Sequence, residues 1–294
     1  MKQSLSKNII QLNLAVLLIS TSGVLGRYID MPSPVVIGLR AFFAAIFLFF
    51  FCKWKKIKLG IANKDFIGIV TGGLLLGLHW ISYFYALQLS SIAIAMLSLF
   101  TYPALTTLLE PLLLKSKINR FQLAFSALVL LGIYFIAPEF NLKDESFIAV
   151  AFGLFSALCF ALRNIIMKSK IQSYNGSALM TQQLIVVAIA SIPFYFFLDT
   201  SNVYHYIPAT VLLALLTTAV GHTLFLYSLK NLSTITASIM SCVQPIYGIL
   251  IGMVFLNEFP DFNTIIGGAI IITTVLAESL RMHYVEKKQE HKKN

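Results

Sequence analysis

Four polar side chains lie inside long apolar stretches of the sequence, where a bound molecule could use them. Arg40 and His79 lie in the first half of the chain, and Gln182 and His222 lie in the second half. An arginine keeps its positive charge and suits a carboxylate, whereas a histidine changes its charge near neutral pH. Because polar groups are costly in an apolar environment, each needs a partner or a function. We therefore predict that these four residues line the path of a small substrate.

Aromatic residues follow His79 directly. Spacings of three and four place His79 with Tyr83, and Trp80 with Phe84, on adjacent faces of a helix. Such a surface can stack on a ligand and also hydrogen-bond to it. Trp80 and Tyr83 are therefore further candidates for substrate binding.

Two prolines, Pro103 and Pro245, each fall in the middle of an apolar stretch. A proline lacks an N–H group and interrupts a helix, which frees a backbone carbonyl one turn earlier. Interrupted helices at matching positions of two halves are typical of a transporter site or its gate. The polar residues near these two breaks are also candidate substrate contacts: Ser98, Tyr102, Ser241 and Gln244.

Each candidate also has a purely structural explanation. Arg40 could extend to the outer headgroups or hold helix carbonyls, and the histidines could bond to neighbouring hydroxyls. Trp80 and Tyr83 could belong to an interfacial aromatic belt, and the prolines could be simple kinks. Glu110 and Arg163 could pair as an inner gate or could be separate interfacial charges.

Small residues and cysteines indicate packing. Glycines four residues apart share one helix face and permit close helix approach at Gly68/Gly72, Gly73/Gly77 and Gly248/Gly252. The three cysteines lie in apolar runs and suit neither a disulfide framework nor a thiolate metal site. No Walker or dinucleotide motif accompanies the glycines. We expect no metal and no other cofactor.

The composition requires a membrane around these residues. Hydrophobic residues make up 58% of the 294 positions, charged residues make up 12%, and the mean hydropathy is +0.82. A water-soluble domain of this size could not hide so much apolar surface. The net charge of +10 does not indicate nucleic-acid binding, because the basic residues form short clusters between the apolar runs.

A membrane-spanning helix needs about 20 mostly apolar residues. Ten such stretches are predicted, and their short connections leave no room for a soluble domain. They cover residues 9–26, 34–52, 66–88, 92–114, 121–137, 147–167, 177–198, 207–229, 236–255 and 264–280. We expect the first stretch to be a retained helix, because no small-x-small cleavage site precedes a soluble domain.

The distribution of basic residues predicts the orientation. With the N-terminus inside, most of the 22 lysines and arginines fall on the cytoplasmic side. The even number of spans then places both termini in the cytoplasm.

The two halves of the chain align at an offset of 142 residues without a gap from the second span to the fifth. Pro103 then falls on Pro245, and the segment YALQLSSIAIA lies over YSLKNLSTITA. Since each half has five spans, the second half enters the membrane in the opposite orientation. An inverted repeat of this kind places a site near the midplane and suits alternating access. Arg40 and His79 are then predicted just below the outer surface, mirrored by Gln182 and His222 near the inner surface.

On these landmarks the chain resembles the EamA-type transporters of the drug/metabolite transporter superfamily. The landmarks are Arg40 in SPVVIGLRAFFAA, the two prolines, and the run PIYGILIGMVFLNEFPDFNTIIGGAIII, in which Glu258 matches the family's glutamate. The first repeat departs from this pattern, with Ser116 at the equivalent position. The resemblance implies ten helices in two inverted five-helix repeats at 1–140 and 141–282, followed by a cytoplasmic basic tail at 283–294.

The predicted function is therefore a secondary transporter in a bacterial inner membrane. The resemblance implies a small-metabolite carrier, often an exporter of amino acids or related compounds, and we expect a monomer or a weak homodimer. The alternative is an integral-membrane lipid-modifying enzyme, which would need clustered Asp, Glu or His at a membrane face. No such cluster occurs in the sequence, and no carboxylate is predicted at mid-depth.

Overall fold

The computed structural model describes residues 5–113, 120–136, 144–224, 241 and 243–290. These residues form helices and their connections, and no strand occurs among them. The helices of the first half are α1 (Leu5–Tyr28), α2 (Ser33–Trp54), α3 (Asn63–Leu89), α4 (Ile92–Leu99), α5 (Tyr102–Leu113) and α6 (Arg120–Ile136).

The second half begins with α7 and ends with a long helix, α14. Its helical segments are α7 (Glu145–Ser173), α8 (Gly176–Ser191), α9 (Phe194–Phe197), α10 (Val203–Leu213), the π-helical segment η1 (Ala214–His222), α13 (Gln244–Leu256) and α14 (Phe262–Glu290).

Several of these segments are long and apolar enough to cross a membrane, which confirms the predicted all-helical membrane class. In the described residues six qualify: Ile10–Tyr28, Ser33–Trp54, Asn63–Leu89, Glu145–Met167, Gly176–Phe197 and Val203–His222. Shorter apolar helices cover 92–106, 244–256 and 262–274. The predicted spans 207–229 and 236–255 extend into residues 225–240, which lie outside the described residues. The ten-span layout therefore stays a prediction.

The predicted span 92–114 is divided between α4 and α5, at Phe100 and Thr101. Pro103 is the second residue of α5, a position where the missing N–H costs no helical hydrogen bond. Thr101 Oγ1 donates a hydrogen bond of 2.8 Å to the Ser98 carbonyl oxygen, which the broken helix would leave without its usual partner. Pro245 likewise lies in the first turn of α13. Each proline thus starts a helical segment in its own half.

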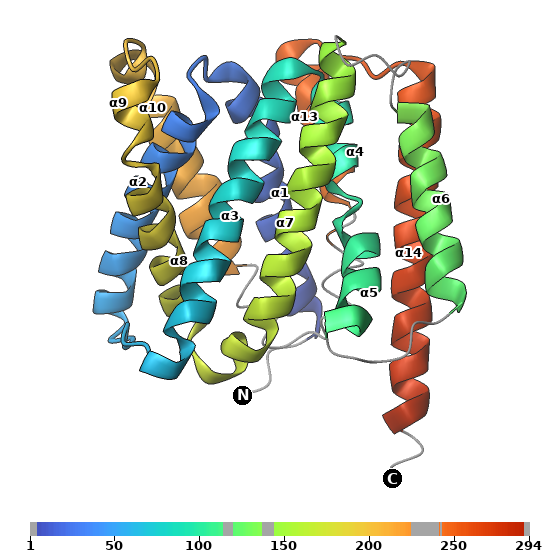
Figure 1. Cartoon of the computed structure of the whole chain (residues 1–294), viewed down its shortest axis with the longest axis horizontal. Helices are drawn as coiled ribbons and strands as arrows, with labels where there is room; N and C mark the ends of the chain where they lie inside the picture. The colour runs from blue at the N-terminus through green and yellow to red at the C-terminus, as the bar shows by residue number, and fades with distance from the viewer. Residues whose placement is uncertain (1–4, 114–119, 137–143, 225–240, 242, 291–294) are drawn as a thin grey trace.

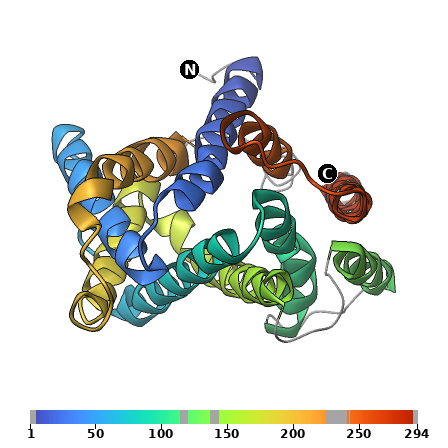
Figure 2. The same ribbon diagram turned by 90° about the horizontal axis from the view of Figure 1, so that it is seen from above.

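Contacts between the two halves come in equivalent pairs when α1, α2, α3 and α4 are matched with α7, α8, η1 and α13. The α3–α7 contact then matches the η1–α1 contact, and α3–α8 matches η1–α2. α4 contacts α7 as α13 contacts α1, while α2–α8 and α6–α14 join helices at equivalent positions of the two halves. Seen from above, α6 and α14 lie together at one side of the bundle, far from α2 and α8 (Figure 2). Exchanging the halves converts each of these contacts into another of the same set or into itself.

Each predicted glycine pair faces a helix of the other half. The partners are α7 for Gly68 and Gly72, α8 for Gly73 and Gly77, and α4 for Gly248 and Gly252. A Cβ atom at Gly73 would lie only 2.7 Å from Val186 Cβ and 3.1 Å from the Gln183 carbonyl oxygen. Small residues therefore allow the two halves to approach closely.

The two ends of the bundle differ in charge. The start of α1 and the end of α14 lie at the same end, together with the connection between α2 and α3 (Figure 1). That connection exposes four lysines, Lys53, Lys55, Lys56 and Lys58, and we call this the basic end. The opposite end, which we call the acidic end, carries Asp30, Asp144, Glu145, Asp199, Glu258 and Asp261.

Candidate functional site

Arg40 lies in the interior of the bundle, on the part of α2 nearer the acidic end. Only 1% of the residue is exposed, and its side chain is among the largest that are fully buried in the described residues. Its Nε donates to Thr218 Oγ1 at 2.8 Å, and Nη2 donates to Thr217 Oγ1 at 3.0 Å. Both acceptors are neutral hydroxyls from η1. They orient the guanidinium group but do not neutralise its charge, and they engage two of its five N–H donors.

The guanidinium group of Arg40 lies on the indole ring of Trp80. Its central carbon is 4.2 Å from the ring centroid, and it is 5.7 Å from the ring of Phe84. A cation over an aromatic face is stabilised by the ring quadrupole. The other neighbour of Trp80 is His222, whose ring centroid lies 6.0 Å away. Arg40, Trp80 and His222 thus form one group contributed by α2, α3 and η1.

His79 belongs to a different group, on the face of α3 that meets α7. Its Nδ1 lies 2.8 Å from Ser156 Oγ, and Ser156 Oγ donates to the His79 carbonyl oxygen at 2.9 Å. The imidazole stacks on Phe160 with 4.5 Å between ring centroids, and Tyr102 meets Phe160 edge-on at 4.8 Å. His79 therefore has a hydroxyl partner, as its structural explanation requires, and is also part of an aromatic cluster.

The structure groups the predicted polar residues differently from the sequence repeat. Gln182, the counterpart of Arg40, lies near the basic end, where its Nε2 donates to the Leu59 carbonyl oxygen at 2.7 Å. Its neighbour Gln183 points into the bundle instead and accepts a hydrogen bond of 2.9 Å from Arg163 Nε. Of the mirrored pair Gln182 and His222, only His222 belongs to the group formed with Arg40 and Trp80.

The remaining candidates lie around these two groups. The Tyr83 hydroxyl is buried beside Ser22 and makes no hydrogen bond of ordinary geometry with the described residues. Ser98 donates to the Ile94 carbonyl oxygen of its own helix at 2.7 Å, on a side that approaches Gly153 of α7. Tyr102 is half-buried against Phe160.

Ser241 is buried three residues before α13, and Gln244 is half-buried in the first turn of α13. The Gln244 carbonyl oxygen accepts a hydrogen bond of 3.2 Å from Ser20 of α1. The side chains of Pro103 and Glu110 lie outside the described residues, as do all atoms of Ser116. The predicted pairing of Glu110 with Arg163 therefore stays untested.

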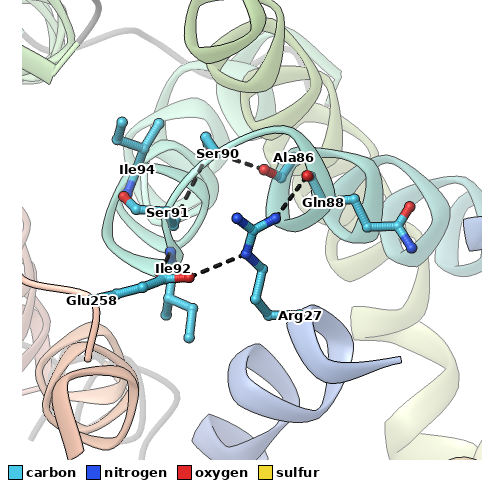
Figure 3. A network of polar contacts seen from close by, with 8 residues as sticks. All are labelled: Arg27, Ala86, Gln88, Ser90, Ser91, Ile92, Ile94 and Glu258. Carbon is cyan, nitrogen blue, oxygen red and sulfur yellow. Dashed lines mark hydrogen bonds and ion pairs between the residues drawn. The ribbon is translucent and has the colours of Figure 1, made fainter. Parts of the chain in front are cut away.

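A network of polar contacts joins several helix ends at the acidic end (Figure 3). Arg27 Nε lies 3.1 Å from Glu258 Oε1, and Arg27 Nη1 donates to the Gln88 carbonyl oxygen at 2.7 Å. Glu258 Oε2 accepts a hydrogen bond of 2.9 Å from the Ile92 N–H, at the first residue of α4. A carboxylate there satisfies a free helix N–H and complements the helix dipole. We call these residues the acidic-end network.

A second network ties α3 to α7 at the basic end. Asp65 pairs with Lys170 at 2.5 Å and accepts a hydrogen bond of 2.7 Å from the Tyr174 hydroxyl. The same hydroxyl accepts a hydrogen bond of 3.1 Å from the Ala62 N–H. We call these residues the basic-end network.

Sequence reasoning missed the partners of the polar groups. Thr217 and Thr218 hold Arg40, Ser156 and Phe160 hold His79, and Arg27 meets Glu258. Adjacent threonines in the middle of an apolar stretch were a usable signal, since polar residues there need a partner. The described residues contain no group of three or more His, Cys, Asp or Glu side chains that could hold a metal ion.

Comparison with known proteins identifies the family. The model of the EamA-like transporter family matches the chain twice, at residues 6–137 and 147–278. An uncharacterized transporter from Archaeoglobus fulgidus is 25% identical over 268 residues, which cover 90% of this chain and 93% of the relative. An S-adenosylmethionine uptake transporter from Rickettsia conorii is 25% identical over 286 residues, covering 94% and 92%.

A solved structure, described only as the crystal structure of a protein, shares the fold. It superposes with a TM-score of 0.66 at 16% identity and covers 96% of this chain and 99% of its own. The sequence relatives are transporters by name, and none of these similarities supports a lipid-modifying enzyme.

Proposed function

Because the chain belongs to the EamA-like transporter family, we propose that it is a secondary transporter that carries a small carboxylate-bearing metabolite across the plasma membrane by alternating access. The substrate is an amino acid or a related compound. The group formed by Arg40, Trp80 and His222 binds it, and the basic end faces the cytoplasm.

The buried charge of Arg40 is the observation that carries this proposal. A permanent cation in the apolar interior is costly, and its described partners are neutral threonine hydroxyls and aromatic faces. A carboxylate accepts bidentate hydrogen bonds from a guanidinium group, which suits the donors that the threonines leave unused. Trp80 offers a face for the apolar part of the same molecule.

The exchanged helix contacts support alternating access. The family model matches each half once, and the main contacts between the halves map onto one another when the halves are exchanged. Two inverted repeats can each adopt the conformation of the other, which opens the path to opposite sides in turn. We assign the repeats to residues 1–140 and 141–282, and the basic tail to 283–294. The lysines of the basic end favour the cytoplasmic side.

The names of the Rickettsia relatives supply one specific substrate to test. S-adenosylmethionine has an amino-acid carboxylate, which Arg40 could bind, and an adenine ring, which Trp80 could stack on. Those relatives are named for uptake, whereas export is the direction that the sequence resemblance implied. Transport must therefore be measured in both directions.

Reconstituted proteoliposomes test the proposal. Labelled amino acids, dicarboxylates and S-adenosylmethionine are supplied outside, and uptake into empty and preloaded vesicles is compared. We expect transport of at least one carboxylate compound by the wild type. Arg40→Gln should reduce it at least about 10-fold and Arg40→Lys less, because losing a charged hydrogen bond costs ~1.5–3 kcal/mol.

Lys58→Gln is the matched control, since it removes a cation from the exposed basic end. It should transport like the wild type. Equal transport by the wild type and Arg40→Gln, at equal amounts of folded protein, would refute the role of Arg40. No transport of any compound by the wild type would refute the substrate class.

A further inference from the structure

Arg163 is a second cation, half-buried on the part of α7 nearer the basic end, and the proposed function does not use it. It lies within the apolar stretch Glu145–Met167 of α7. Its Nε donates to Gln183 Oε1 at 2.9 Å and its Nη1 donates to Asn164 Oδ1 at 3.0 Å, while Nη2 lies 4.0 Å from Met180 Sδ. All three partners are neutral. They fix the direction of the guanidinium group without compensating its charge.

Arg163 belongs to the same interior region as Arg40. Phe160, one helical turn before Arg163, stacks on His79, and the next residue after His79 is Trp80, on which Arg40 lies. The ring of Trp80 also lies 6.0 Å from the ring of His222, measured between centroids. These contacts link Arg40, His222, His79 and Arg163 through one region between α2, α3, α7 and η1.

This region has no described negative charge. The described ion pairs, Arg27–Glu258 and Lys170–Asp65, lie at the two ends of the bundle, and no other Asp or Glu is hydrogen-bonded to either guanidinium group within the described ranges. Arg40 is buried and Arg163 is half-buried, and in either place a charge whose described partners are all neutral is costly. An anionic ligand with two charged groups would neutralise both.

The two guanidinium groups share no described partner. Arg40 is held by η1 and Trp80 on the side of the acidic end, whereas Arg163 is held by Gln183 and Met180 of α8 on the side of the basic end. Each guanidinium group is therefore a separate position for a carboxylate. His79 is the chain neighbour of Trp80 and Phe160 lies one turn before Arg163, so their stacked rings connect the two positions and could contact the middle of an extended molecule.

Resting on the proposed transport function, we propose that Arg163 binds a second carboxylate of the substrate, so that the transported compounds are dicarboxylates, including acidic amino acids. Arg40 binds one carboxylate and Arg163 binds the other. The distance between the two guanidinium groups then selects the length of the chain that joins the carboxylates.

Binding to the purified full-length protein tests this without requiring transport. Thermal stabilisation is titrated with unbranched dicarboxylates of four to seven carbons, the monocarboxylates of the same lengths, leucine and S-adenosylmethionine. We expect one dicarboxylate length to bind best and at least about 10-fold more tightly than its monocarboxylate, a ratio that corresponds to ~1.4 kcal/mol. Equal affinities for mono- and dicarboxylates of the wild type would overturn the proposal.

Substitutions test whether Arg163 binds the second carboxylate. Arg163→Gln should reduce dicarboxylate affinity at least about 10-fold and leave monocarboxylate affinity unchanged, whereas Arg40→Gln should weaken both. Lys58→Gln should change neither. If Arg163→Gln melts too early to be titrated, Arg163→Lys replaces it and should shift the preferred chain length. An unchanged ratio and an unchanged preferred length would overturn the assignment.

The competing explanation is an ion pair between Arg163 and Glu110. In that case Glu110→Gln would lower the melting temperature as much as Arg163→Gln, and a double variant would cost no more than either single one. That result would overturn the proposal. Proteoliposome transport of leucine or S-adenosylmethionine, without dicarboxylate binding, would overturn the second carboxylate but leave the proposed transporter function intact.

Discussion

Arg27 and Glu258 at the acidic end join the ends of four segments, whereas Asp65 and Lys170 at the basic end join two helices that already pack together. The acidic-end network connects α1, α3, the start of α4 and the turn after α13 (Figure 3). The basic-end network fastens α3 to α7, which also meet through Gly68 and Gly72.

The two pairs also differ in their exposure to solvent. Arg27 and Glu258 side chains are 37% and 21% exposed, against 23% and 12% for Lys170 and Asp65. Water competes more strongly for exposed charges, so the acidic-end pair is the easier one to open. We therefore predict that the acidic-end network releases when the path opens, and call it the latch, whereas the basic-end network stays closed, and we call it the fixed tie.

The largest expected effect comes from the packing of α3 on α7, the two helices that the basic-end network joins. Gly72→Leu places a side chain against Met167 of α7 and should destabilise the protein by about 1–3 kcal/mol, the usual cost of overpacking. Gly60→Leu is the control, because a Cβ atom there would meet nothing within 4 Å. Thermal unfolding in detergent measures both. Similar melting temperatures for the two variants would show that close α3–α7 packing is not required.

The next effect concerns access rather than stability. Glu258→Gln keeps an acceptor for the Ile92 N–H but removes the charge that attracts Arg27, so the acidic end should open more often. A shift of ~1 kcal/mol changes the open population about fivefold. The rate at which an impermeant thiol reagent labels His79→Cys, in a background without Cys52, Cys159 and Cys242, measures this opening. An unchanged rate would mean that the network is not a latch.

A smaller effect is expected at the basic end. Asp65→Asn removes the charge that pairs with Lys170 but leaves an acceptor for Tyr174. We expect a modestly lower melting temperature and no change in thiol labelling at position 79. Faster labelling would show that the basic-end network also works as a latch, and the contrast between the ends would fail.

The smallest effect is expected for an acidic residue outside both networks. The Ser201 N–H lowers the pKa of exposed Asp199 by hydrogen bonding to its carboxylate, with the Ser201 side chain contributing less. At a pH above the pKa of Asp199 in the unfolded state, the lowered pKa stabilises the folded protein. This stabilisation is lost as the pH falls through the pKa of Asp199 in the folded state. Because Asp199 belongs to neither network, Asp199→Asn should leave the rate of thiol labelling at position 79 unchanged. Any difference in melting temperature between the variant and the wild type should disappear as the pH falls.

The sequence by itself determined the membrane class, the positions of most helices and the candidates for chemistry. Apolar stretches about 20 residues long cannot fold in water, and they cross a bilayer only as helices or barrels, so composition and length settle the class. The predicted stretch 34–52 agrees with α2 (Ser33–Trp54) for this reason. The break before Pro103 was also predictable, because proline cannot continue a helix in its interior.

Only the tertiary structure decided which side chains meet. The repeat predicted only that Arg40 and His79 lie at a similar depth, and helix packing turns Arg40 toward Thr217 and Thr218 while His79 faces Ser156. Successive residues are about 100° apart around a helix axis, so rotating the helix about that axis changes which neighbour a side chain faces. The spacing of residues in the sequence does not fix this rotation. The meeting of Arg27 with Glu258, 231 positions apart, likewise depends on how the helix ends are brought together.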